Sequence, residues 1–137
     1  MERSTVGLAL VPADGLGPVR GNVREQLAQW GQSAVADDCL LVVSELLANA
    51  YGHGTAPVRL SLALHAQAGG QVVRVQVSDM GPGFDIELVS ARWRHPSFCL
   101  SQGGRGLVLV DALCLAWGER RDRRGHTVWA DLRRGTA

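Results

Sequence analysis

The stretch Ala36–Gly54, ADDCLLVVSELLANAYGHG, carries the strongest helical pattern in the chain. Asp37 and Asp38 stand at its start, where carboxylates cap a helix and complement its dipole, and Gly52 and Gly54 mark its end. The apolar positions that cover most of the helix circumference are Leu40, Leu41, Val43, Leu47, Ala48 and Ala50. The pattern therefore predicts a largely buried central helix.

Shorter patterns on both sides of this helix indicate strands and one further helix. VGLALVP (residues 6–12) is typical of a first strand, and PVRGNVREQLAQW (residues 18–30) has helical spacing. Residues 57–66 and 71–79 alternate as two strands joined by the turn AQAGG, and residues 114–132 form a second hairpin pattern at the end of the chain. We expect one domain with helices and a mainly antiparallel sheet.

Composition narrows the function classes. The net charge of +1 gives no strong field toward nucleic acid or an anionic membrane, so neither is an expected partner. All 14 basic residues are arginine, which excludes a phosphate site built around a lysine. The three cysteines are widely spaced and form no CxxC pair, which disfavours a zinc site or a disulfide framework. With no secretory leader pattern, we expect a cytoplasmic protein with reduced thiols.

Glu45 and Asn49 lie four residues apart on the central helix and so share one of its faces. An amide carbonyl oxygen suits Mg²⁺, and a carboxylate can orient or deprotonate an attacking hydroxyl or water. The alternative is that the two side chains bond to each other or cap a neighbouring strand. The pair alone does not decide between these readings.

The stretch SDMGPGF (residues 78–84) follows a strand. A carboxylate at Asp79 can accept a hydrogen bond from an exocyclic amine such as that of adenine. Gly81 and Gly83 lack side chains where a flat ring would approach the backbone. The alternative is an ordinary turn after the strand.

GGRGLVLV (residues 103–110) places glycines before a helical pattern. Backbone N–H groups at a helix start can bind an anion, and Arg105 adds positive charge there. Residues 85–102, between the two glycine clusters, have little periodicity and the length of a mobile lid. Glycines before a helix are common, so the cluster is suggestive only in combination with the other two pieces.

In this order, the three pieces resemble the ATP-binding domain of the GHKL superfamily, which includes gyrase B, heat-shock chaperone ATPases, histidine kinases and mismatch-repair ATPases. SELLANAYGHG resembles the N box, SDMGPGF the first glycine box and GGRGLVLVDAL the second. The short chain and its ending HTVWADL most resemble the anti-sigma factor serine/threonine kinases of bacteria. The resemblance implies an ATP-binding α/β two-layer sandwich over residues 1–137, with a mixed, mainly antiparallel sheet and helices on one face.

The resemblance also implies roles for individual residues. Asn49 corresponds to the Mg²⁺ ligand, Glu45 to the catalytic base and Asp79 to the carboxylate that reads adenine. The remaining positions implied to contact ATP are His53 near the mouth of the site, Gly81 and Gly83 beneath the nucleotide, Gly104, Arg105, Gly106 and Leu107 on the phosphate side, and Thr127 in the adenine-side network.

Three functions remain open at this point. The first is a kinase that uses ATP and Mg²⁺ to phosphorylate a serine or threonine of an anti-sigma antagonist and sequesters a sigma factor or similar partner. The second is a non-catalytic protein-binding module gated by ATP, and the third a stand-alone ATPase domain of the histidine-kinase type. A purely structural domain is the remaining alternative. Chains of the resembled branch often form homodimers through their first strand and helix.

Overall fold

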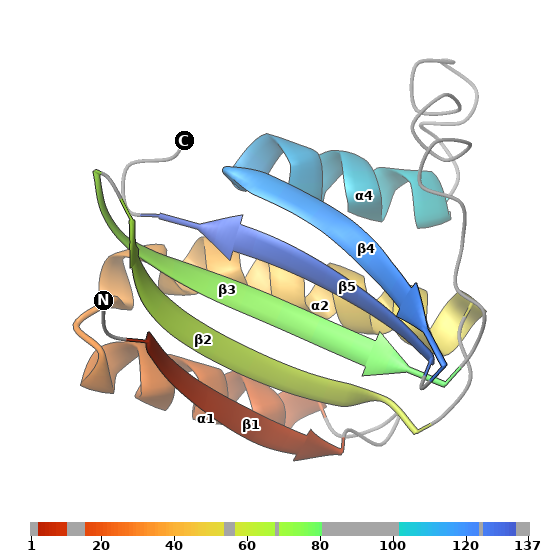
Figure 1. The fold of residues 1–137 in the computed structure, drawn as a ribbon, viewed down its shortest axis with the longest axis horizontal. Coiled ribbons are helices and arrows are strands. Elements are labelled where there is room, and N and C mark those ends of the chain that lie inside the picture. The colour runs from red at the N-terminus through yellow and green to blue at the C-terminus, as the bar shows by residue number, and fades with distance from the viewer. Residues whose placement is uncertain are drawn as a thin grey trace.

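The computed structural model describes residues 3–10, 16–53, 57–67, 69–80, 102–123 and 125–133. In chain order the elements are β1 (Arg3–Leu10), α1 (Leu16–Gln29), the short 3₁₀ helix η1 (Ser33–Val35), α2 (Ala36–His53), β2 (Arg59–Gln67), β3 (Gly70–Asp79), α4 (Gln102–Leu113), β4 (Ala116–Asp122) and β5 (Gly125–Leu132) (Figure 1).

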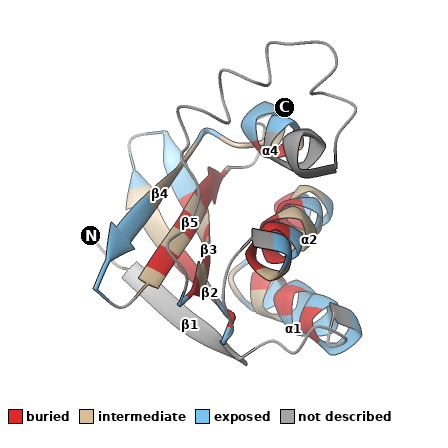
Figure 2. Ribbon diagram, turned by 90° about the vertical axis from the view of Figure 1, so that its right-hand side faces the viewer, coloured by how far each residue is buried: buried red, intermediate tan, exposed pale blue. Residues whose placement is uncertain are grey.

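The strands form one five-stranded sheet in the order β1-β2-β3-β5-β4. Helices α1, α2 and α4 all lie on one face of this sheet (Figure 2), which confirms the predicted two-layer α/β sandwich. Each of the four pairings between neighbouring strands is antiparallel. The described strands therefore contain no parallel pair, although the resemblance implied a mixed sheet. Both predicted hairpins, β2–β3 and β4–β5, are present.

The hydrophobic core lies between the sheet and the helices. Alternate residues of β2, β3 and β5 point inward and are buried, as the period of two in a strand requires. The inward residues of these strands are Leu60, Leu62, Val73, Val75, Val77, Val128, Ala130 and Leu132. They belong to one buried cluster with residues of α1 and α2, namely Val23, Leu27, Val42, Val43, Leu46 and Leu47.

Helix α2 is largely buried, as its composition predicted, but two of its apolar residues are not. Leu41 is 47% exposed, and Ala48 is also exposed, whereas Val43 and Leu47 are buried. The sheet covers one side of the helix, and α1 and α4 flank it in the same layer and leave its outer side open (Figure 2).

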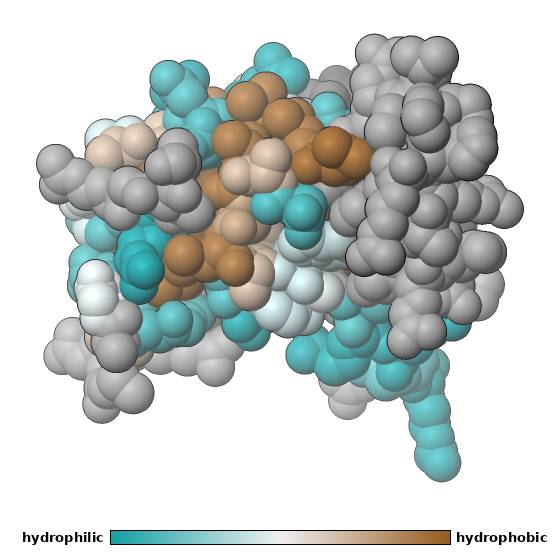
Figure 3. All heavy atoms as spheres, turned by 90° about the horizontal axis from the view of Figure 1, so that it is seen from above, coloured by the Kyte–Doolittle hydropathy of each residue, from teal (hydrophilic) through white to brown (hydrophobic). Residues whose placement is uncertain are grey.

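The α4–β4 side of the molecule also carries apolar surface. Figure 3 views this side from above and shows hydrophobic side chains gathered on it. Val108 of α4 is 37% exposed, and Leu115, between α4 and β4, is 41% exposed. Among the described residues, no helix is long and apolar enough to cross a membrane.

The turn between β4 and β5 brings the start of β5 against the end of β3. Gly125 has a φ of 135°, which side chains rarely tolerate, and a Cβ built on it would lie 2.1 Å from the carbonyl oxygen of Asp79. The same Cβ would lie 2.9 Å from Cα of Met80. Only glycine fits this crossing, so Gly125 helps fix where Asp79 stands.

We expect Gly125→Ala to destabilise the fold by more than about 1 kcal/mol. A strained backbone angle alone costs about 1–3 kcal/mol, and the clash with Asp79 adds to this cost. Chemical denaturation of both proteins measures the difference in the free energy of unfolding. Gly21→Ala is the matched control, since nothing lies within 4 Å of a Cβ at that position in α1. That control should be neutral or should stabilise by up to about 1 kcal/mol. Equal effects at the two positions would contradict the close approach.

Two cysteine thiols sit in the helical layer. Burial raises the pKa of Cys39, in α2, from 9.0 to about 12, with smaller contributions from Cys114 and Asp38. Burial likewise raises the pKa of Cys114 to about 12, with help from Asp131, Asp111 and Asp38. In both cases the folded protein favours the neutral thiol.

A thiol whose pKa rises on folding stabilises the fold below the unfolded pKa, and this stabilisation is lost as the pH rises from about 9 to about 12. We expect the stability difference between the wild type and Cys114→Ala to shrink over this range, because only the wild type loses the contribution. Urea unfolding at several pH values between about 8 and about 11 measures this difference. A difference that stays constant with pH would contradict the prediction.

Candidate functional site

The predicted site residues converge on one end of the sheet. Figure 1 places the C-terminal end of α2, the end of β3 and the start of α4 at this end. The turn between β4 and β5 lies there as well. Segments that are far apart in the sequence therefore contribute to one region of the fold.

Asp79, the last residue of β3, is buried, and its side chain is only 3% exposed. It follows the inward residues Val75 and Val77 in the alternation of the strand, so its carboxylate belongs to the helix-covered face. His126 of β5 lies directly opposite Asp79 in the register. The imidazole Nδ1 is 3.4 Å from the Asp79 carboxylate oxygen Oδ2.

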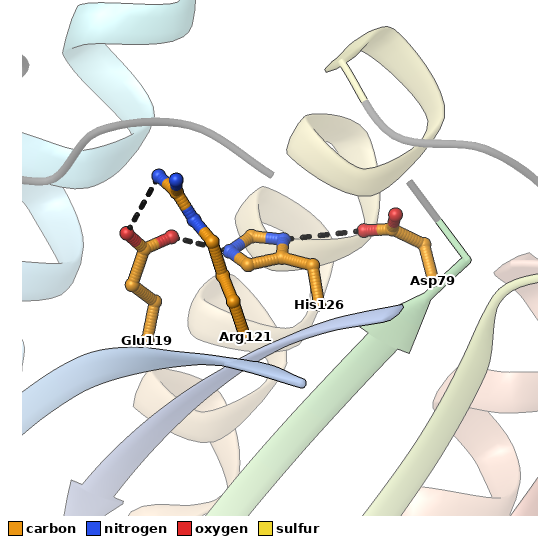
Figure 4. A network of polar contacts seen from close by, with 4 residues as sticks. All are labelled: Asp79, Glu119, Arg121 and His126. Carbon is orange, nitrogen blue, oxygen red and sulfur yellow. Dashed lines mark hydrogen bonds and ion pairs between the residues drawn. The ribbon is translucent and has the colours of Figure 1, made fainter. Parts of the chain in front are cut away.

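The imidazole of His126 has a second carboxylate on its other side. Its Nε2 contacts Oε2 of Glu119, and Oε1 of Glu119 accepts a hydrogen bond of 3.1 Å from Nη2 of Arg121. Figure 4 shows His126 between the carboxylates of Asp79 and Glu119, with Arg121 beside Glu119. A neutral imidazole can donate from only one ring nitrogen, whereas an imidazolium donates to both carboxylates.

The His126 imidazole contacts one oxygen of the Asp79 carboxylate and fixes its orientation. A carboxylate offers about four lone-pair positions on its two oxygens, so one such group can accept several hydrogen bonds at once, including one from a ligand amine. His126 thus acts as a positioning residue for Asp79.

The sequence analysis did not single out His126 and chose its neighbour Thr127 instead. The structure corrects the placement of Thr127: it pairs with Ser78 and lies on the opposite face of the sheet from Asp79. The signal was present in GHTVWADL, because His126 has the same phase as the buried Val128, Ala130 and Leu132. A histidine at an inward position of an apolar strand needs polar partners.

Asn49 of α2 is buried, with 8% exposure, and within the described part of the chain its Nδ2 has no hydrogen-bond partner. Glu45, one turn earlier, is half-buried, and no hydrogen bond joins it to Asn49 among the described contacts. The hydrogen bond between Glu45 and Asn49, which was one structural alternative to a ligand site, is therefore not present in the part of the chain that the structure describes. A buried donor without an acceptor is costly, so this amide is suited to receive an acceptor from a ligand.

The same amide fits a magnesium ion only in part. Its carbonyl oxygen is a ligand type that Mg²⁺ prefers. Among the residues the structure describes, no three His, Cys, Asp or Glu side chains gather closely enough to hold a metal ion. A magnesium ion here would take most of its ligands from phosphate groups and water, as is usual for this ion.

The second glycine cluster lies inside α4, not before it. The helix begins at Gln102, so Gly104, Arg105 and Gly106 belong to its first turns, followed by Leu107. The sequence analysis placed these glycines before the helix, and the helix in fact begins about one turn earlier. The first four N–H groups of a helix have no acceptor within it, so the start of α4 still offers donors and a positive dipole end.

Three other predictions cannot be compared with the structure. His53 ends α2, but its side chain lies outside the described residues. Gly81 and Gly83 also lie outside them, as does the expected lid from residue 85 to residue 101. Their roles stay predictions.

Comparison with known proteins identifies the domain type. Residues 12–132 match the family described as "Histidine kinase-like ATPase domain". The comparison with curated proteins found no match. Among solved structures, the chain is similar to the histidine kinase domain from the Erythrobacter litoralis EL346 blue-light activated histidine kinase, with 23% identity and a TM-score of 0.48. That alignment covers 85% of this chain and 60% of the solved chain.

The family match spans most of the sequence and includes α2, the end of β3 and α4, the three elements that build the site. The chain belongs to the histidine kinase-like ATPase domain family, whose members bind ATP.

Proposed function

We propose that this protein is a cytoplasmic, ATP- and Mg²⁺-dependent regulatory kinase that phosphorylates a serine or threonine of a protein antagonist. The observation that carries the proposal is the buried Asn49 amide, whose Nδ2 has no partner among the residues that the structure describes, on the same helix face as Glu45. In a family that binds ATP, phosphate oxygens and a magnesium ion are the partners such an amide would take. The ending HTVWADL and the N-box-like SELLANAYGHG add the resemblance to anti-sigma factor kinases.

Asp79 would select the base. Adenine carries an exocyclic amine that can donate to a carboxylate, whereas guanine carries a carbonyl oxygen at the corresponding position. A carboxylate facing that oxygen is repelled. With His126 and Glu119 holding the Asp79 carboxylate in one orientation, the site would favour ATP over GTP.

Asn49, Glu45 and the start of α4 would act on the phosphate end. When bound, Mg²⁺ neutralises charge on the phosphates, and the Asn49 carbonyl oxygen would be one of its ligands. Unsatisfied N–H groups in the first turn of α4 would hold phosphate oxygens. Glu45 would accept the proton of the attacking serine or threonine hydroxyl.

The resemblance also suggests how the kinase would regulate. Its partners would be an anti-sigma antagonist, which receives the phosphate, and a sigma factor or similar protein, which the kinase holds inactive. Phosphorylating the antagonist would prevent it from displacing that partner. The nucleotide state would therefore set which partner is bound.

We expect Asp79→Asn to weaken ATP and ADP binding by at least about tenfold, because a hydrogen bond to a charged acceptor contributes about 1.5–3 kcal/mol. It should also narrow the preference for ATP over GTP. Isothermal titration calorimetry with each nucleotide and Mg²⁺ measures both effects, and circular dichroism confirms the fold. The control is Asp37→Asn, whose side chain is 88% exposed at the other end of α2. If Asp79→Asn binds ATP as tightly as the control, Asp79 does not read the base.

We expect Glu45→Gln to abolish phosphate transfer while leaving ATP binding within about threefold, because the amide keeps the shape of the side chain but cannot accept a proton. Labelled ATP and candidate antagonist domains provide the assay. Acid treatment of the product distinguishes stable phosphoserine or phosphothreonine from labile phosphohistidine. Transfer by Glu45→Gln at the wild-type rate would rule out its role as base. ATP binding without any transfer by the wild type would favour the gated binding module, and an acid-labile product the histidine-kinase type.

A further inference from the structure

Four polar side chains line up across the helix-free face of the sheet. In the strand register, Arg59 of β2 pairs with Ser78 of β3, Ser78 with Thr127 of β5, and Thr127 with Arg120 of β4. Since residues directly opposite one another share a face, these four form one row, which we call the Arg59–Arg120 row. Two long cationic side chains thus flank two short hydroxyl side chains.

The row lies on the face opposite the proposed nucleotide site. Its residues alternate along the strands with the inward Leu60, Val77 and Val128. All three helices lie on the other face of the sheet (Figure 2). Asp79 and His126 border the region where the strands end, but the alternation places their side chains on the inner face.

A hollow of about 600 Å³ is lined by all four residues of the row. Its lining also includes Asp122 and Arg123 of the β4–β5 turn, and Asp79 and His126 at the adjoining ends of β3 and β5. This volume falls within the range of pockets that hold small molecules or peptide side chains, about 300–1,000 Å³.

The arginines around the hollow differ from others in the molecule. Arg24, Arg74 and Arg121 each form an ion pair with a carboxylate. Within the part of the chain that the structure describes, Arg59, Arg120 and Arg123 form none. Two carboxylates, Asp79 and Asp122, also line the hollow and have interactions of their own. Three arginines against two carboxylates leave the lining with an excess of positive charge.

We propose that the Arg59–Arg120 row binds a phosphate monoester carried by a serine or threonine of a protein segment. Guanidinium groups match the geometry of phosphate and bind it in a bidentate manner, and clusters of arginine are a recurrent means of recognising phosphorylated peptides. The hydroxyl groups of Ser78 and Thr127 supply two further donors to the phosphate oxygens. The row lies on the sheet face opposite the proposed nucleotide site, although the hollow reaches Asp79 and His126 where the strands end. Its binding does not depend on the proposed kinase activity.

Two features favour a phosphorylated polypeptide over other anions. The hollow is larger than one phosphate group needs, which leaves room for the residues next to the phosphorylated side chain. The chain as a whole has a net charge of only +1, so it lacks the broad positive surface that a nucleic acid backbone requires.

The test uses the full-length protein with saturating ADP and Mg²⁺, so that the nucleotide site is filled. Fluorescence anisotropy measures binding of a labelled nine-residue phosphoserine peptide at physiological salt. The matched probes are the unphosphorylated peptide, inorganic phosphate as a competitor and a single-stranded oligonucleotide. The variants are Arg59→Gln with Arg120→Gln, and Thr127→Val, which removes only a hydroxyl. Arg24→Gln is the control, because it removes an exposed arginine that pairs with Asp37 on the helical side.

We expect the double variant to lose phosphopeptide affinity by at least tenfold (about 1.4 kcal/mol) and Thr127→Val to lose it by a smaller factor. Arg24→Gln and the wild type should bind equally, and all variants should bind ATP normally. The proposal is overturned by equal binding of the two peptides, by unchanged affinity in the double variant, or by oligonucleotide binding with the same dependence on these arginines. Competition by inorganic phosphate without any phosphopeptide binding would also overturn it, in favour of a site for free phosphate. Loss of ATP binding in the wild type would refute the proposed kinase but not this site.

Discussion

The pairing register between β3 and β5 is the constraint on which both surfaces of the sheet depend. It sets Asp79 opposite His126 and Ser78 opposite Thr127. A slip of one residue would move every side chain of one strand to the other face and separate both pairs. Gly125 secures this register, because the backbone of β3 occupies the space where any other residue would carry its Cβ. This glycine therefore helps to keep Asp79 and His126 on the helix-covered side of the sheet and Ser78 and Thr127 on the other.

The network from Asp79 to Arg121 consists of ionisable side chains on the helix-covered face of the sheet. The other inward residues of the strands on this face are mostly apolar. Burying an isolated charge is very costly, and here each group has a partner: Asp79 and Glu119 flank His126, and Arg121 closes the exposed end. Apolar residues of similar volume would often be as stable at such positions. A network retained at the open end of a sheet, within a domain family that binds ATP, is more readily explained by ligand recognition than by stability.

Local sequence patterns correctly predicted the helices, the hairpins and the inward residues of the strands. The alternation of Val73, Val75 and Val77 led to Asp79 as the inward residue at the end of a strand, and the structure buries it there. The assignment of Thr127 took the wrong phase of β5, although the alternation of Val128, Ala130 and Leu132 already indicated that His126, not Thr127, faces inward. The start of α4 was misplaced because glycines disfavour helices, although tertiary packing can override that preference. The partner of Asp79 and the Arg59–Arg120 row depend on pairing between distant strands, which no local pattern reveals.

Arginine supplies every permanent positive side chain of this protein, and the sheet uses it in two ways on one face. Arg74 lies opposite Asp131 in the register and binds it through two contacts of 2.7 and 2.9 Å. Its guanidinium also stacks 4.4 Å from the centre of the Trp129 ring, which Gly118 accommodates by having no side chain. At the other end of the same strands, the partners of Arg59 and Arg120 are Ser78 and Thr127, which cannot neutralise them. The register thus pairs Arg74 with a carboxylate in one half of this face, and in the other half it leaves two arginines beside hydroxyl groups, where an anionic ligand could bind them.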